Sequence, residues 1–84
     1  MGRLEPVIVL LDELEALRLC DLVGLDQEEA GRRMGVSRGT VQRLLAAGRA
    51  KVVDALVHGK GIVLSGGDHI RLPPGRHGWG QRGG

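Results

Sequence analysis

Apolar positions in the first part of the chain predict a short strand followed directly by a helix. Val7 to Leu10 form an unbroken run that is partly β-branched, which is typical of a strand. The segment 12–23 is rich in Leu, Ala and Glu, so we expect a helix there. Asp12 is its expected N-cap, with Glu15 at capping-box spacing, and Gly24 is its expected stop.

The next two helices carry their own start and stop residues. Asp26 is placed to cap a short helix over 27–34, and Gly35 is placed to end it. Ser37 is the expected N-cap of a third helix over 38–58, which at 1.5 Å per residue would be roughly 30 Å long. The pattern therefore predicts three helices after the strand.

Beyond the third helix the pattern changes to short apolar runs separated by glycine. Ile62 to Leu64 and His69 to Leu72 predict two strands joined by the turn 65–68, so we expect a C-terminal β-hairpin. The glycine-rich segment 73–84 is expected to be a flexible tail. The predicted fold is mainly α: a three-helix helix-turn-helix domain over 1–72, with a short N-terminal strand and a C-terminal β-hairpin.

Composition restricts the classes of function. Eighty-four residues make one small domain, and the absence of Phe and Tyr excludes RNA readers that stack bases on aromatic side chains. The single cysteine, Cys20, excludes a disulfide framework and a cysteine-rich zinc module. The longest apolar run is too short to span a bilayer and no signal peptide precedes it, so we expect a cytoplasmic protein with no membrane partner.

Charge divides the chain into two unlike parts. Residues 1–31 carry eight acidic and two basic residues, whereas residues 32–84 carry ten basic and two acidic ones. A charge step of this size indicates a polyanionic partner for the second part. A solvated basic face without a partner is the alternative.

Residues 27–45 satisfy the spacing of a helix-turn-helix, whose second helix would lie in a DNA major groove. Gly31 is a small residue where the two helices would cross, and Gly35 suits a turn with positive φ. Because alanine also fits a close crossing and favours helix, we expect Gly31→Ala to leave stability unchanged or slightly raised. An ordinary helical hairpin is the alternative. Apolar residues stand where they would hold the pair together: Ala30, Met34, Val36, Val41 and Leu44.

The outward side of the third helix supplies the candidates for base contacts. Arg38 and Gln42 are four residues apart and share one face, and they are the first candidates. Arginine matches the acceptor pair of guanine, and glutamine matches the donor–acceptor pair of adenine. Arg43 is expected to contact a base or a phosphate, and Gly39 would let the helix backbone approach the duplex closely.

Phosphate contacts are expected on either side of these residues. Ser37 and Thr40 lie near the N-terminus of the third helix, and Arg32 and Arg33 belong to the preceding helix. Arg49 lies on the flank of the third helix and completes the predicted DNA-binding set. For each of these side chains, a solvated polar or charged group is the alternative.

No catalytic site, metal site or cofactor is expected. The carboxylates cluster in the first turns of two helices, where negative charge favours the helix dipole and no acid–base role is needed to explain them. Cys20 and the three histidines, His58, His69 and His77, lack metal-ligand spacing. No Ser–His–Asp pattern or phosphate loop is present, so an enzyme is not expected.

Several blocks of the sequence resemble bacterial and archaeal proteins of the domain-of-unknown-function 134 family. The blocks are DELEALRL over 12–19, QEEA over 27–30 and MGVSR over 34–38, and the resemblance extends over about residues 7–67. Members are regarded as candidate DNA-binding proteins similar to the helix-turn-helix of sigma-factor region 4. The resemblance implies the same role for this chain, which has Gly31 where the family typically has alanine.

These patterns together predict sequence-specific binding to double-stranded DNA and a role in transcription regulation. One alternative is a protein-interaction module that uses the helix-turn-helix as a scaffold, and another is RNA binding assisted by the basic tail over 81–84. A homodimer is also expected, because one helix-turn-helix contacts only one half-site and short strands need partners. The sequence leaves open whether the strands pair within or between chains.

Overall fold

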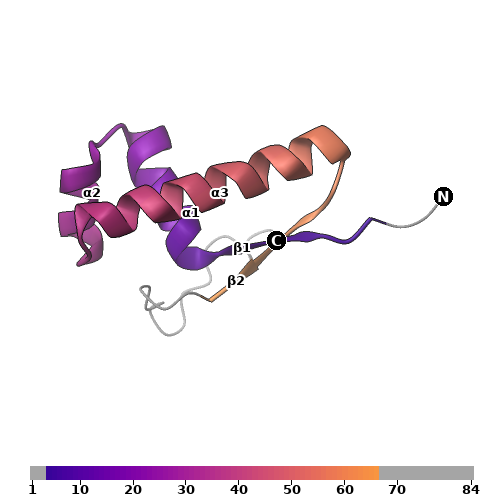
Figure 1. The fold of residues 1–84 in the computed structure, drawn as a ribbon, viewed down its shortest axis with the longest axis horizontal. Coiled ribbons are helices and arrows are strands. Elements are labelled where there is room, and N and C mark those ends of the chain that lie inside the picture. The colour runs from indigo at the N-terminus through magenta and orange to yellow at the C-terminus, as the bar shows by residue number, and fades with distance from the viewer. Residues whose placement is uncertain (1–3, 67–84) are drawn as a thin grey trace, which may run out of the picture.

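The computed structural model describes residues 4–66, which form three α-helices, one π-helical segment and two strands. In Figure 1, α3 lies across α1, with α2 at its N-terminal half and the strands below its C-terminal half. The two halves of α3 therefore belong to different parts of the molecule. The elements in chain order are β1 (Val7–Leu10), α1 (Leu11–Leu17), the π-helix η1 (Arg18–Val23), α2 (Gln27–Met34), α3 (Arg38–His58) and β2 (Ile62–Ser65).

Strand β1 runs directly into α1, and the expected cap of this helix is wrong. Leu10 is the N-cap, and its backbone N–H donates to the Glu13 carboxylate at 2.9 Å. Asp12 is instead the second residue of the helix and is only 3% exposed, while Glu15 pairs with Arg18. Because no linker separates the strand from the helix, the carboxylate three residues after Leu10 takes the capping role.

The last part of the first predicted helix is a π-helix, η1, rather than an α-helix. Its end at Gly24 is confirmed, with a φ of 95° that favours glycine. Leu19 of this segment is buried in the core, whereas Leu22 is 80% exposed. The segment thus anchors its first turn and leaves its last turn in solvent.

Helices α2 and α3 begin and end at the predicted residues. Asp26 Oδ1 accepts the Glu29 N–H at 2.8 Å, and Gly35 ends α2 with a φ of 75°. At the start of α3, Ser37 Oγ accepts the Thr40 N–H at 3.1 Å. These caps act within three residues of the helix ends, which is why the sequence alone predicted them.

Two buried glycines mark the closest approaches between elements. A Cβ on Gly31 would lie 2.7 Å from the carbonyl oxygen of Val36, in the turn that follows α2. The expectation that Gly31→Ala leaves stability unchanged is therefore wrong, because a backbone carbonyl this close leaves no room for a methyl group. Gly48 is enclosed in a similar way, since its Cβ would lie 3.0 Å from Leu17 Cδ1. That approach of α1 to α3 explains a glycine inside a long helix.

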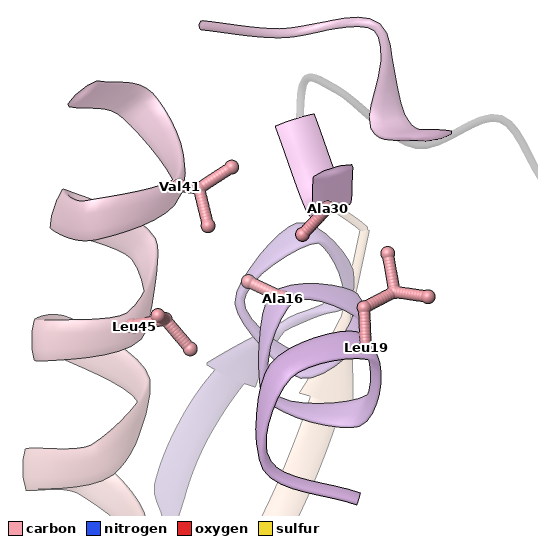
Figure 2. Close-up of a cluster of buried hydrophobic side chains, with 5 residues drawn as sticks. All are labelled: Ala16, Leu19, Ala30, Val41 and Leu45. Carbon is pink, nitrogen blue, oxygen red and sulfur yellow. The ribbon is translucent and has the colours of Figure 1, made fainter. Parts of the chain in front are cut away.

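The main core lies between α1, η1, α2 and the N-terminal half of α3. Figure 2 shows Val41 and Leu45 pointing from α3 toward Ala16 and Ala30. The small alanines allow the helices to approach closely, and Leu19 closes the cluster from η1. Burial of these aliphatic groups holds the α2–α3 pair on α1.

A nearly buried ion pair joins the start of α1 to the middle of α3. Lys51 Nζ donates to both carboxylate oxygens of Glu13, at 2.8 and 3.0 Å. The Glu13 side chain is 6% exposed, and the Lys51 side chain is one-third exposed. Glu13 therefore caps α1 and binds α3 with the same carboxylate.

The two strands pair with each other in parallel. Among the described residues, β2 therefore pairs with β1 and does not form the predicted C-terminal hairpin. β2 pairs with β1 in the register Val7↔Ile62 to Leu10↔Ser65, within one chain. Val7 and Val9 face Ala55 of α3 in a second small cluster. A parallel pair needs a long crossover, which the helical part between β1 and β2 supplies. The second predicted strand over 69–72, the turn to it and the tail over 73–84 lie outside the described residues.

Within the part of the chain that the structure describes, no helix combines the length and apolar character needed to cross a lipid bilayer.

Candidate nucleic-acid interface

The N-terminus of α3 is suited to hold an anion. Its first turn contains no acidic residue, whereas α1 and α2 each carry two, so the positive end of the α3 dipole is not compensated. Among residues 4–66, no acceptor is bonded to the backbone N–H groups of Arg38 and Gly39. The hydroxyls of Ser37 and Thr40 lie 3.0 Å apart and are engaged in the cap. The geometry favours the backbone amides over these hydroxyls as phosphate donors.

Arg38 and Gln42 lie on exposed positions of α3, as the sequence predicted. Among residues 4–66, no carboxylate is within ion-pair distance of Arg38. One helical turn separates the two side chains, so they project from neighbouring points of the same face. Both are free to extend from the helix toward a ligand.

Arg43 and Gly39 lie close together on the exposed side of α3. Arg43 Nη2 donates to Thr40 Oγ1 at 3.3 Å, which holds the guanidinium over the first turns of the helix. A Cβ on Gly39 would have no neighbour closer than 3.9 Å, so packing within the chain does not require glycine there. Gly39 lowers the helical propensity of α3 and leaves its backbone open to a large ligand.

Arg32 and Arg33, both exposed on α2, share one carboxylate. Each lies within ion-pair distance of Glu29, and Arg33 Nε is 3.4 Å from Glu29 Oε2. The hydrogen bond and charge of Arg32 lower the pKa of Glu29, and the pKa of Arg32 is raised in turn. Exposed pairs of this kind contribute little to stability, so a phosphate could displace the carboxylate at small cost.

Arg49 occupies a different position from the other predicted residues. Its guanidinium donates two hydrogen bonds to Asp21 of η1, at 3.0 and 2.7 Å. The hydrogen bond lowers the pKa of Asp21 and raises that of Arg49. This pair joins α3 to η1. It explains why an arginine stands at position 49 without requiring a contact to DNA.

A groove lined by carboxylates lies beside Arg38, and sequence reasoning missed it. Asp21, Asp26 and Glu28 line this groove together with Arg38 and Arg49. These residues come from three elements, so no local spacing in the sequence signals their convergence. Because the carboxylates would repel a phosphate backbone, Arg38 would reach a duplex only by extending out of this groove.

No metal site is formed by the described residues. Among residues 4–66, no three histidine, cysteine or carboxylate side chains are placed to hold an ion. His58 pairs instead with Asp54 at 2.7 Å, and burial raises the pKa of the Cys20 thiol, which disfavours the thiolate that would bind a metal. His69 and His77 lie outside the described residues.

Comparison with known proteins shows clear relatives. A UPF0251 protein of Pyrococcus horikoshii is 56% identical over 59 residues, which are 70% of this chain and 54% of the relative. UPF0251 proteins of Prosthecochloris aestuarii and Moorella thermoacetica are 52% and 55% identical, over 77% and 88% of this chain and 42% and 50% of the relatives. This chain thus spans about half the length of these relatives. No solved structure matches it.

The family match covers most of the chain. Residues 2–72 match the family described as a protein of unknown function, DUF134. This range includes every described helix and strand, and the relatives are more than half identical to the chain over their matched parts. The chain therefore belongs to the DUF134 family.

Proposed function

We propose that this chain binds double-stranded DNA in a sequence-specific way through α2 and α3, as a non-catalytic regulator of transcription in the cytoplasm. The observation that carries the proposal is the N-terminal half of α3. It combines exposed Arg38, Gln42 and Arg43 with unbonded N–H groups and a first turn free of carboxylates. A polyanion would meet favourable charge and hydrogen-bond donors at the same place.

The two helices would contact different parts of the DNA. The N-terminal half of α3 would enter the major groove, with Arg38 and Gln42 reaching base edges. The N–H groups of Gly39 and its neighbour would bind one phosphate, and Arg32 and Arg33 of α2 would bind the phosphates beside it. This arrangement is that of a helix-turn-helix similar to sigma-factor region 4.

A homodimer forms part of the same proposal. One α3 covers only one half-site, and a second copy would pair two half-sites about one turn of DNA apart. The strands β1 and β2 pair within one chain, so their need for a partner is met in part without a second copy.

A protein-interaction module is the second candidate. The carboxylates of Asp21, Asp26 and Glu28 beside Arg38 favour it, because a mixed-charge groove suits a polar protein surface better than a phosphate backbone. RNA binding through the tail rested on residues 81–84, which lie outside the described range.

Selection of binding sites from a random duplex pool tests the proposal. We expect an enriched sequence, and we expect the chain to prefer it to random duplex by a ratio that persists when salt is raised. The matched control is Arg18→Ala, since Arg18 is exposed, is paired with Glu15 and does not belong to the predicted DNA-binding set. Equal binding to selected and random DNA, or loss of binding in both Arg18→Ala and Arg38→Ala, would contradict the assignment.

A further inference from the structure

Asp12, in the first turn of α1, is a buried carboxylate whose partner is missing from the described residues. Among residues 4–66, its Oδ1 is the only buried side-chain oxygen or nitrogen without a hydrogen-bond partner. The residue is 3% exposed, and none of the ion pairs in this part of the chain includes it. Aspartate is seldom buried to this extent without a partner, because its charge is costly to remove from water.

The neighbouring carboxylate, Glu13, shows what a buried charge at this position normally has. Glu13 is 5% exposed, close to the value for Asp12. It accepts the Leu10 N–H at 2.9 Å, and Lys51 Nζ lies 2.8 Å from its Oε1. The start of α1 therefore holds two buried carboxylates, of which one is paired with a cation and the other is not.

The basic side chains of the described part of the chain do not supply the missing cation. Most of them already pair with other carboxylates. The two that remain, Arg38 and Arg43, are exposed on the N-terminal half of α3, and neither forms an ion pair with Asp12. The paired ones are Arg18, Arg32, Arg33, Arg49, Lys51, His58 and Lys60.

Asp12 lies next to the edge at which both strands end. In the parallel register, Leu10 at the end of β1 pairs with Ser65 at the end of β2. Asp12 follows Leu10 by two residues, because β1 runs directly into α1 (Figure 1). Helical side chains lean toward the N-terminus of their helix, so the Asp12 carboxylate leans toward this edge. The chain that continues from Ser65 therefore leaves the sheet beside Asp12.

The segment that continues from β2 is rich in basic residues. Arg71 is the first arginine of this segment, and the six residues from Ser65 to it can span up to about 20 Å. Arg3 also lies outside the described range, but it comes before β1, whose four residues lead away from this edge by about 13 Å. Residues 67–84 contain one acidic residue, Asp68, and five basic ones: His69, Arg71, Arg76, His77 and Arg82.

We infer that an ion pair between Arg71 and the buried carboxylate of Asp12 holds the segment after β2 on the domain. A guanidinium presents parallel N–H donors that match both oxygens of a carboxylate, so one arginine can satisfy Asp12. The pair would join the chain beyond β2 to the start of α1, across the end of the sheet. This contact does not depend on DNA binding.

A double-mutant cycle in the full chain, followed by urea melts, tests the inference. Asp12→Asn keeps the shape of the side chain and removes its charge. If Asp12 is paired, Asp12→Asn and Arg71→Gln should each lower the folding equilibrium constant about tenfold or more, because each leaves a partner unpaired. The double variant should be about as stable as the less stable single variant, because both substitutions remove the same interaction.

Two matched controls separate the pair from other effects. Glu28 stands at the second position of α2, as Asp12 does in α1, and it is exposed and forms no ion pair among residues 4–66. Glu28→Gln therefore measures the loss of the helix-dipole interaction alone, which should change the folding constant by at most about fivefold. Arg76→Gln is the control for Arg71, and its effect should simply add to that of Asp12→Asn.

The direction of the Asp12→Asn effect decides the outcome. A variant at least as stable as wild type would overturn the inference, because removing an unpaired buried charge is favourable. Losses for Asp12→Asn and Arg71→Gln that add fully in the double variant would overturn it as well. Hydrogen exchange at the arginine side chains of the wild-type protein gives a readout that needs no variant. We expect the Arg71 Nε–H to exchange more slowly than that of Arg76, and equally fast exchange at both would contradict the pair.

Discussion

At Gly31 the fit between α2 and the turn after it depends on a single hydrogen atom in place of a methyl group. Its Cβ would lie 2.7 Å from a carbonyl oxygen, whereas at Gly39, which is equally helical, nothing lies closer than 3.9 Å. The two glycines therefore make a matched pair: the same substitution by alanine would clash with backbone at Gly31 and would meet no close neighbour at Gly39.

We expect Gly31→Ala to destabilise the domain and Gly39→Ala not to. The clash at Gly31 should cost about 2–3 kcal/mol, which outweighs the gain in helix propensity of about 1 kcal/mol. At Gly39 only the gain remains. Urea melts of both variants measure the difference, and a Gly31→Ala variant at least as stable as Gly39→Ala would show that the Val36 carbonyl moves aside freely.

The basic side chains are expected to separate into two groups in DNA binding. Arg38→Ala or Gln42→Ala should cost about 1–3 kcal/mol on the selected site and little on random duplex, because base contacts carry sequence preference. Arg33→Ala should weaken binding to every duplex and reduce the salt slope by about one unit, because a phosphate contact releases counterions. Gel shifts at several salt concentrations measure both effects. Equal losses on both kinds of DNA for all three variants would contradict the base-reading assignment.

Between elements, two ion pairs of different burial connect α3 to the first helical segment. Lys51 pairs with the nearly buried Glu13, and Arg49 pairs with the exposed Asp21. Removing Lys51 leaves a carboxylate in the interior, whereas removing Arg49 leaves one in water.

We expect Lys51→Ala to destabilise the domain by about 2–3 kcal/mol, less than for a fully buried pair because Lys51 is one-third exposed. That loss corresponds to a fall of roughly 10–20 °C in Tm for a domain of this size. Arg49→Ala should cost less than about 1 kcal/mol. Thermal melts at neutral pH compare the losses of stability in the two variants. A larger loss for Arg49→Ala than for Lys51→Ala would show that the Arg49–Asp21 pair contributes more to stability than the Lys51–Glu13 pair.

The sequence predicted the helix boundaries, which local signals determine. It did not predict the contacts between residues that are far apart in the chain. The caps of α2 and α3 act within three residues, and both helices were predicted to the residue. The Glu13–Lys51 and Asp21–Arg49 pairs join residues 38 and 28 positions apart, for which spacing gives no sign. Glycine after β2 favoured a hairpin, but β2 pairs with β1 across the whole helical part. The candidate residues at the start of α3 were found, and the carboxylates beside them were not.

For the molecule as a whole, exposed carboxylate pairs contribute to the response to acid. The pKa values of Asp21, Glu29 and Asp54 are all lowered by hydrogen bonds to basic partners. A carboxylate with a lowered pKa in the folded state gives stability that is complete above its ordinary pKa of about 4 and is lost as pH falls through the lowered value.

We therefore expect the contribution of these pairs to be constant from pH 7 to about pH 5 and to decline below about pH 4. Asp21→Asn should be less stable than wild type at pH 7, and the difference should shrink as pH falls below about 4 and through the lowered pKa of the wild-type carboxylate. Glu28→Gln is the control, because Glu28 forms no ion pair among residues 4–66. Urea melts at a series of pH values measure the difference; a gap for Asp21→Asn that does not shrink as pH falls below about 4 would exclude the Arg49 pair as its cause.

The parallel pairing of β1 with β2 has a consequence for the order in which the chain folds. The two strands close a loop that contains every helix, so their contact brings the largest loss of chain entropy in the domain. Helical contacts are closer in sequence and can form first, which leaves the strand pair to close over an assembled helical core. Val9→Ala, in the buried part of β1, should then speed unfolding while leaving the folding rate almost unchanged. Stopped-flow kinetics would show this as a shift of the unfolding arm alone, and would identify the strand pair as the last part of the domain to form and the first to open.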